Sequence, residues 1–184
     1  MKPAVFLDRD GVLVQGRIDQ GVLAAPQDVS DLRLAPDAPE AVRRLRAAGF
    51  VLVMATNQPD VARGKTDRTT VEQINTHVEA ALGLDDVRCC FHDDADDCPC
   101  RKPRPGLLVE AAADLDLDLS RSWMIGDRWV DIAAAHTAGV RSVLVECEYS
   151  WQPSAAGSPP AGLQPTACVP SLGDAVTLIL EREI

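Results

Sequence analysis

Two aspartates near the amino terminus have the spacing of a catalytic pair. The apolar residues 5–7 lead into Asp8 and Asp10, and Gly11 lets the chain turn directly afterwards. Side chains two residues apart on an extended chain point the same way, so these carboxylates converge if the extended geometry continues past the strand. Adjacent carboxylates repel each other unless positive charge lies beside them, and Mg²⁺ is an oxygen-ligated cation that suits such a site. One aspartate could then attack phosphorus while the other moves a proton. The alternative is an ordinary strand that ends in a solvated Asp-Gly turn.

Two more polar groups follow apolar stretches. Thr56 and Asn57 come after residues 50–55, and their hydroxyl and amide groups suit phosphate oxygens, although capping of the next turn explains them as well. Asp127 and Asp131 are spaced i, i+4 around an expected helix start, so they can share one face. A second pair of carboxylates favours a metal site, and simple N-capping by Asp127 is the alternative.

Basic residues gather in two short segments. Lys102, within residues 101–104, provides the positive charge that a phosphoryl-transfer transition state needs. A lysine in a basic loop is, in isolation, usually just solvated. Arg63 and Lys65 either hold a second phosphate or are solvated loop charges, and the sequence slightly favours the solvated interpretation.

Four residues have the composition of a structural zinc site. Cys90, His92, Cys98 and Cys100 supply three thiolates and one imidazole, a complete tetrahedral set for Zn²⁺. Unrelated thiols in an acidic loop are the alternative, and the neighbouring Cys89 is an extra thiol that can compete as a ligand. A site with four protein ligands has no open position for substrate, so we expect it to hold Arg101 and Lys102 in place.

Length, charge and cysteine content narrow the class of protein. The 184 residues fit one domain, predicted to span 1–184. Apolar runs fall short of the roughly 20 residues of a membrane span, and an early aspartate precedes any signal-peptide core, so we expect a cytoplasmic protein. A net charge of -10 argues against nucleic-acid and anionic-membrane partners. In a reducing compartment the cysteines indicate metal ligands or buried thiols, and Cys147 and Cys168 are expected to be buried.

Hydrophobic periodicity predicts alternating strands and helices, and therefore a largely parallel sheet with helices on both faces. After the first strand we expect helices at 36–48, 67–82, 106–115, 129–138 and 171–181, strands at 50–55, 87–91, 122–126, 141–145 and 167–169, and loops at 14–35 and 150–166, the latter a surface loop or flexible flap. The expected fold class is a Rossmann-like three-layer α/β/α sandwich. Ligands in such folds bind at the carboxyl ends of the strands, where the polar groups are expected to meet.

Four segments resemble the signatures of one phosphatase superfamily, in its order along the chain. FLDRDGVL, ATNQPDVARG, CRKPRPG and GDRWVD are similar to the four signatures of the haloacid-dehalogenase-like (HAD-like) phosphohydrolases. The CxH and CxCRKP elements resemble the zinc-bearing branch that contains histidinol-phosphate phosphatases and heptose-bisphosphate phosphatases. The resemblance covers residue 5 to about 145. Pro59-Asp60 departs from the small residue and glycine usual there, which leaves the turn and any role for Gln58 open.

The resemblance implies a role for each matching residue. Asp8 would be the nucleophile and Asp10 the general acid and base. Mg²⁺ would be held by Asp8, the backbone carbonyl of Asp10, and Asp127, with Asp131 supporting them from outside. The groups expected to bind phosphate or substrate are Thr56, Asn57, Arg101 and Lys102, with Arg63 or Arg128 as further candidates for a phosphate that stays on the product.

The resemblance also implies a substrate class and an architecture. A small phosphorylated sugar, D-glycero-D-manno-heptose 1,7-bisphosphate cleaved at position 7, is the favoured substrate, with histidinol phosphate as the enzymatic alternative. A zinc-stabilised binding module that lost catalysis is the non-enzymatic alternative. No inserted stretch is long enough for a separate cap domain, so the site should be open, with the zinc loop at about 89–104 as its main wall. Related small capless phosphatases are commonly monomeric, and a monomer is expected here.

Overall fold

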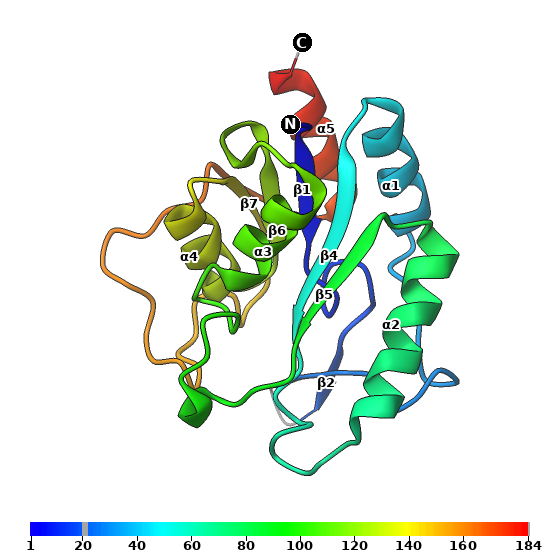
Figure 1. Cartoon of the computed structure of the whole chain (residues 1–184), viewed down its shortest axis with the longest axis vertical. Helices are drawn as coiled ribbons and strands as arrows, with labels where there is room; N and C mark the ends of the chain where they lie inside the picture. Colours follow the sequence, from blue (N-terminus) through cyan, green and yellow to red (C-terminus); the bar gives the residue numbers. More distant parts are fainter. Residues whose placement is uncertain (20–21, 184) are drawn as a thin grey trace.

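A parallel six-stranded sheet forms the centre of the computed structural model, which describes residues 1–19 and 22–183 (Figure 1). The strand order is β5-β4-β1-β6-β7-β8, and every neighbouring pair is parallel. The strands of this sheet are β1 (Ala4–Leu7), β4 (Val51–Asn57), β5 (Asp86–Cys90), β6 (Trp123–Gly126), β7 (Arg141–Val145) and β8 (Ala167–Val169).

Helices cover both faces of the sheet, so the predicted three-layer α/β/α fold is confirmed (Figure 1). The helices are α1 (Ala38–Ala47), α2 (Arg68–Leu82), α3 (Gly106–Leu115), α4 (Trp129–Ala138) and α5 (Leu172–Arg182), with short 3-10 turns η1 (Asp94–Asp96) and η2 (Leu119–Arg121). One hydrophobic core joins α1, α2 and α5 to the sheet, and a second core joins α3 and α4 to the opposite face. No helix in the described part of the chain is long and apolar enough to cross a membrane.

Strand β1 shows why the central strands are apolar throughout. Its alternate residues belong to different cores, with Val5 and Leu7 on one face and Ala4 and Phe6 on the other. All four side chains are fully buried. A strand covered on both faces has no solvent side, so it carries no polar alternation. Asp8, the first polar residue after β1, therefore lies where the strand leaves the buried sheet at its carboxyl end.

The ends of the helices and strands determine where the loops lie. Asp67 caps α2 by accepting a hydrogen bond from the backbone N–H of Thr70 at 2.8 Å, and Gly83 ends the helix in a left-handed conformation with φ 66°. Because all strands of the sheet run the same way, the segments after β1, β4, β5 and β6 leave from one edge, at the bottom of Figure 1.

Two expectations about the rest of the chain were wrong. The predicted loop 14–35 contains an antiparallel hairpin of β2 (Arg17–Asp19) and β3 (Val22–Ala24), because strands of three residues are too short to give a periodic signal. Cys168 is exposed and Cys147 is only half-buried, although both were expected to be buried. Cys168 lies in β8, which is an edge strand of the sheet and has no neighbour on its outer side in the described chain.

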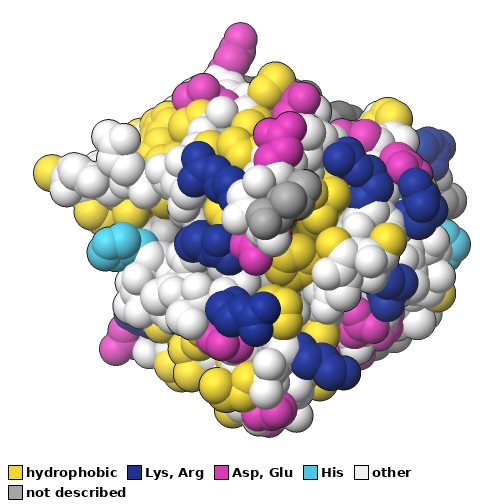
Figure 2. All heavy atoms as spheres, turned by 90° about the horizontal axis from the view of Figure 1, so that it is seen from above, with side chains coloured by type: hydrophobic (Ala, Val, Ile, Leu, Met, Phe, Trp, Pro, Cys, Tyr) yellow, Lys and Arg dark blue, Asp and Glu magenta, His cyan; other side chains and the backbone are white. Residues whose placement is uncertain are grey.

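The opposite edge, where the strands begin, carries charges of both signs. Lys and Arg side chains lie interspersed with Asp and Glu on this end of the molecule (Figure 2). Arg141 pairs with Glu183 at 2.5 Å and Arg46 with Asp85 at 3.1 Å. These arginines are therefore neutralised within the chain.

Candidate active site

Three aspartates from distant parts of the sequence meet at the carboxyl edge of the sheet. Asp8 follows β1, Asp127 follows the neighbouring strand β6, and Asp131 lies in the first turn of α4. One carboxylate oxygen of each lies within 4.8 Å of the others. Asp131 also accepts a hydrogen bond from the backbone N–H of Arg128 at 3.0 Å, which fixes it at the helix start. We call these three residues the acidic cluster.

Lys102 lies against this cluster. Its Nζ contacts Asp8 Oδ1 at 3.0 Å and Asp131 Oδ1 at 2.6 Å, and donates a hydrogen bond to the carbonyl of Ala55 at 2.8 Å. The side chain is only 2% exposed. Burial opposes its charge, but the carboxylates of Asp131 and Asp8 raise the pKa of Lys102 above its ordinary value. Lys102 therefore remains a cation beside the expected nucleophile.

The carboxylates are crowded and largely shielded from water. Burial raises the pKa of Asp8 to about 7, with Asp131 and Asp10 adding to the rise and Lys102 opposing it. Burial and the neighbouring Asp8 and Asp131 raise the pKa of Asp127 well above its usual range. One lysine does not neutralise three carboxylates, so these shifts mark a shortage of positive charge.

This shortage matches the needs of a hard divalent cation. Both carboxylate oxygens of Asp127 are buried and have no hydrogen-bond partner among the described residues. Buried polar atoms are normally paired, and carboxylate oxygens are the ligands that Mg²⁺ prefers. The residues present therefore fit a magnesium ion held by Asp8 and Asp127, with Asp131 beside them.

Asp10 is not a member of the acidic cluster, although its charge adds to the raised pKa of Asp8. The extended geometry stops at Leu7 and the chain turns, so the i, i+2 relation is lost. Asp10 instead accepts hydrogen bonds from Arg9 Nε at 3.1 Å and Arg9 Nη2 at 2.9 Å, and from Gln58 Nε2 at 2.8 Å. Three donors thus hold one carboxylate in a defined orientation next to the cluster.

Arg9 was not predicted to be a site residue and the role of Gln58 was left open, but both lie beside Asp10 in the structure. Arg9 is fully buried, and its Nη1 donates a hydrogen bond to Asn75 Oδ1 on α2 at 2.7 Å. Gln58 also donates to the hydroxyl of Thr56 at 2.9 Å. The available signal was an arginine between two aspartates directly after a buried strand, since a buried arginine requires a carboxylate partner.

Thr56 and Asn57 lie at the carboxyl end of β4, where they were expected. The hydroxyl of Thr56 is buried and faces Gln58. The side chain of Asn57 makes two hydrogen bonds with the backbone of Lys102, accepting from its N–H at 3.1 Å and donating to its carbonyl at 2.9 Å. Asn57 therefore fixes the loop that carries Lys102.

Two of the three arginines considered for substrate binding are engaged by acidic residues. Arg101 forms a two-pronged ion pair with Asp94, with Nε and Nη2 each 3.0 Å from a carboxylate oxygen. Arg63 pairs with Asp93 at 2.5 Å and with Asp94 at 3.3 Å. Arg128 lies over the ring of Tyr149 at 5.9 Å from its centre. None of these three guanidinium groups contacts the acidic cluster among the described ion pairs.

The expected zinc ligands come together as one group. Sγ of Cys100 lies 3.3 Å from Sγ of Cys90, 3.5 Å from Sγ of Cys98 and 3.3 Å from Nδ1 of His92. A tetrahedron with Zn–S bonds of about 2.3 Å separates its sulfurs by about 3.8 Å, so these distances fit a common central ion. The cluster directly precedes Arg101 and Lys102 in the chain.

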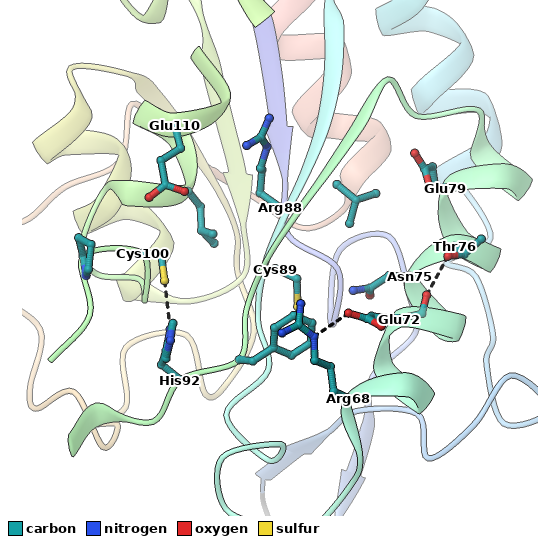
Figure 3. Close-up of a pocket in the computed structure, with 14 residues that line it drawn as sticks. Arg68, Glu72, Asn75, Thr76, Glu79, Arg88, Cys89, His92, Cys100 and Glu110 are labelled. Atoms are coloured by element: carbon teal, nitrogen blue, oxygen red, sulfur yellow. Dashed lines mark hydrogen bonds and ion pairs between the residues drawn. The ribbon is translucent and has the colours of Figure 1, made fainter. Parts of the chain in front are cut away.

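Cys89 is outside this group, because side chains alternate along β5. Cys90 points toward α3 and the other three expected zinc ligands, whereas Cys89 points toward α2. Cys89 lines a cavity of about 620 Å³ between α2, β5 and the zinc loop, together with Arg68, Asn75 and Phe91 (Figure 3). Burial raises the pKa of the Cys89 thiol to about 11. The cavity contains no member of the acidic cluster, so it is separate from the candidate active site.

Comparison with known proteins agrees with this geometry. A family model described as HAD-hydrolase-like matches residues 99–175. The D-glycero-beta-D-manno-heptose-1,7-bisphosphate 7-phosphatase of Pasteurella multocida (strain Pm70) is 33% identical over 156 residues, which are 79% of this chain and 82% of that protein. The protein of the same name from Photorhabdus laumondii is 36% identical over 150 residues, 75% of this chain and 77% of that protein. The chain belongs to the HAD-like phosphatases.

A solved structure extends the likeness to the whole fold. The D,D-heptose 1,7-bisphosphate phosphatase from B. bronchiseptica, determined with magnesium and phosphate, has a TM-score of 0.78 and 28% identity, covering 98% of this chain and 99% of that one. As an HAD-like phosphatase, this chain is a phosphoric monoester hydrolase. The resemblance inferred from four short signatures is confirmed.

Gly11 gives a test of the acidic cluster. It has φ +87°, and a Cβ at this position would overlap the carboxylate of Asp127 and lie 3.0 Å from the hydroxyl of Tyr149. We expect Gly11→Ala to lower phosphate release about 100-fold, because displacing an active-site group such as Asp127 by about 1 Å can have an effect of that size. Initial rates at saturating Mg²⁺ measure this.

Gly64→Ala is the matched control. Gly64 also has a positive φ, +68°, but no atom lies within 4 Å of its Cβ position. It should lose about 1 kcal/mol of folding stability and keep its activity. Equal loss of activity in both variants would show that backbone strain, rather than contact with Asp127, explains the effect.

Proposed function

We propose that this chain removes the 7-phosphate of D-glycero-D-manno-heptose 1,7-bisphosphate through an aspartyl-phosphate intermediate. The observation that carries the proposal is the buried Lys102, whose Nζ lies 3.0 Å from Asp8 at the edge of the acidic cluster. The named function of the similar heptose bisphosphatases supports the choice of substrate. Lys102 both restrains the attacking carboxylate and leaves positive charge where phosphoryl oxygens arrive.

Asp8 and Asp10 divide the chemistry in the proposed mechanism. A carboxylate oxygen of Asp8 attacks phosphorus, and the bond from phosphorus to the sugar oxygen breaks as Asp10 donates its proton to that oxygen. Asp10 then takes a proton from water, whose oxygen attacks the aspartyl phosphate. Inorganic phosphate leaves and Asp8 is regenerated. The hydrogen bonds from Arg9 and Gln58 orient Asp10 for both proton transfers.

The remaining polar groups bind the transferring phosphoryl group. Lys102 and the hydroxyl of Thr56 are proposed to contact its oxygens, and Asn57 contributes by holding the Lys102 backbone. Mg²⁺ bound by Asp8, the Asp10 carbonyl and Asp127 supplies charge neutralisation for the approach of an anionic substrate. Without it, the acidic cluster would repel a phosphate dianion.

Zinc is proposed to have a structural role. Cys90, His92, Cys98 and Cys100 use all four positions of a tetrahedral ion, which leaves none for substrate. The ligand Cys100 is followed directly by Arg101 and Lys102. Zinc would therefore fix the start of the segment that carries Arg101 and Lys102.

Turnover of a substrate panel tests the proposed function. With Mg²⁺ supplied, we expect phosphate release from heptose 1,7-bisphosphate to exceed that from histidinol phosphate in kcat/KM by at least about 10-fold, which corresponds to about 1.4 kcal/mol. Asp8→Asn should abolish release, and Asp114→Asn, an exposed aspartate on α3, should not. A preference for histidinol phosphate would contradict the proposed substrate. Equal release by wild type and Asp8→Asn would support a binding module.

The raised pKa of Asp8 predicts how magnesium stabilisation depends on pH. With a folded-state pKa of about 7, against 3.8 ordinarily, metal-free folded protein keeps a proton that the unfolded chain has lost. Stability from this group therefore falls as pH rises from about 4 to about 7. Magnesium binds the deprotonated carboxylate, so its stabilising effect should grow over the same window.

Thermal unfolding with and without about 5 mM Mg²⁺ measures this effect. A concentration of this order is enough to occupy a weak site with oxygen ligands. The magnesium-induced rise in Tm should be larger at pH 8 than at pH 5.5, and Asp8→Asn should remove most of the difference. A rise that is independent of pH in wild type would contradict magnesium binding at Asp8.

Substitution of single cysteines tests the zinc assignment. Cys98→Ser should lose the bound zinc, measured by elemental analysis of purified protein, and lower the thermal midpoint, since structural zinc contributes directly to folding. Cys168→Ser is the matched control because Cys168 is exposed and outside the cluster. Unchanged zinc content in Cys98→Ser would contradict the assigned ligand set.

A further inference from the structure

We propose that Asp94 is a specificity-determining residue that occupies the binding site for the second phosphate of a bisphosphate substrate. Its carboxylate engages Arg101 and Arg63, and the phosphate that remains on the product must displace it. The inference rests on the proposed function, because it takes Arg101 to be a substrate-binding residue. It adds an internal competitor that sets the affinity for bisphosphates relative to monophosphates.

The Asp94–Arg101 pair has the geometry of anion recognition. Arg101 presents Nε and Nη2 to the two oxygens of Asp94, each at 3.0 Å. A guanidinium uses this parallel fork for carboxylates and phosphates alike. Arg101 is 12% and Asp94 24% exposed, so solutes can reach the pair.

Arg63 approaches the same carboxylate from another loop. It lies between β4 and α2, and its Nη2 is 3.3 Å from Asp94 Oδ2. Arg63 is 29% exposed, and its Nη2 also pairs with Asp93 at 2.5 Å. One carboxylate therefore bridges two guanidinium groups from separate segments, an arrangement that a phosphate with three acceptor oxygens would satisfy more fully.

The position of Asp94 is fixed by its own turn. Asp93 accepts a hydrogen bond from the backbone N–H of Asp94 at 2.8 Å, and its own N–H donates to Asp96 at 2.7 Å. These two bonds cap η1 at its start. Asp94 is thus presented to the arginines by a short ordered element.

The bridged arginines belong to segments that adjoin the reacting centre. Arg101 directly precedes Lys102, whose Nζ is 3.0 Å from Asp8, and consecutive Cα atoms are about 3.8 Å apart. The β4–α2 loop that carries Arg63 begins after Asn57, whose side chain is hydrogen-bonded to the Lys102 backbone. A sugar with its reacting phosphate at Lys102 could therefore place a second phosphate at the pair.

The competition affects only substrates with two phosphates. A bisphosphate must break the Asp94 contacts before both arginines can bind its second phosphate, so part of its binding free energy is used for displacement. A monophosphate leaves these contacts intact. Removing the charge of Asp94 should therefore favour the bisphosphate selectively.

Steady-state kinetics of Asp94→Asn test the proposal. The variant should show a KM for heptose 1,7-bisphosphate about fivefold lower than wild type, the change expected for releasing one partly exposed ion pair. The KM for heptose 7-phosphate should stay within about twofold, and kcat should be unchanged for both. Asp97→Asn is the matched control, since Asp97 is an acidic residue of the same loop that pairs with Arg104. Thermal midpoints confirm that each variant is folded.

The outcomes separate the two proposals. An unchanged KM for the bisphosphate, or an equal change for both substrates, would overturn the role of Asp94 while leaving the proposed function intact. Absence of wild-type turnover would overturn the proposed function instead. In that case, equilibrium binding of fructose 1,6-bisphosphate and fructose 6-phosphate decides the inference. Tighter binding of the bisphosphate alone by Asp94→Asn supports it, and unchanged binding contradicts it.

Discussion

The charge of one buried lysine holds the catalytic edge of this molecule together. Lys102 lies between Asp8 and Asp131, and burying any of these charges alone would cost several kcal/mol. Together they offset part of that cost, which is why a fully enclosed lysine keeps a raised pKa. The contact also joins three distant segments, since Asp8 follows β1, Asp131 begins α4 and Lys102 belongs to the zinc loop. The sheet edge and the loop are therefore coupled by electrostatics as well as packing.

Several independent contacts keep Lys102 in position. The carbonyl of Ala55 accepts a hydrogen bond from its Nζ, and Asn57 makes two hydrogen bonds with its backbone, so strand β4 holds both ends of the residue. Cys100, one of the proposed zinc ligands, lies two residues earlier. A flexible side chain restrained in this way loses its conformational freedom during folding rather than during substrate binding. The positive charge of Lys102 is therefore preorganised for a phosphoryl group.

Much of this arrangement could be predicted from the sequence, for a topological reason. Asp8, Thr56 and Asp127 each follow an apolar strand, and the carboxyl ends of parallel strands share one edge, so their proximity follows from the order of elements. The clustering of Cys90, His92, Cys98 and Cys100 was predictable because zinc-ligand chemistry and close spacing in the chain both point to the same four residues. Both inferences depend on local patterns that the fold preserves.

The parts that could not be predicted depend on non-local partners. The direction of Asp10 is decided by Arg9 and Gln58, and Arg9 in turn depends on Asn75, which is 66 residues away. Likewise, Arg101 has the motif of a substrate-binding residue, but its partner in the folded chain is Asp94. Spacing in the sequence indicates where the backbone of a charged residue lies, but it does not identify the residue that its side chain contacts. The hairpin of β2 and β3 was not predicted for a different reason, since strands of three residues are too short to show a hydrophobic period of two.

The balance of charge explains why a chain so acidic can act on an anion. When ionised, the three carboxylates of the acidic cluster exceed the single charge of Lys102 by two, which is the charge of the magnesium ion that their oxygens suit. With such an ion bound, the cluster would no longer repel a phosphate. Arg63 and Arg101 of the two adjoining loops would then offer positive charge to the substrate once their aspartate partners are displaced. In the proposed mechanism, substrate recognition involves two exchanges: magnesium would replace the proton of Asp8, and a substrate phosphate would replace the Asp94 carboxylate at Arg101.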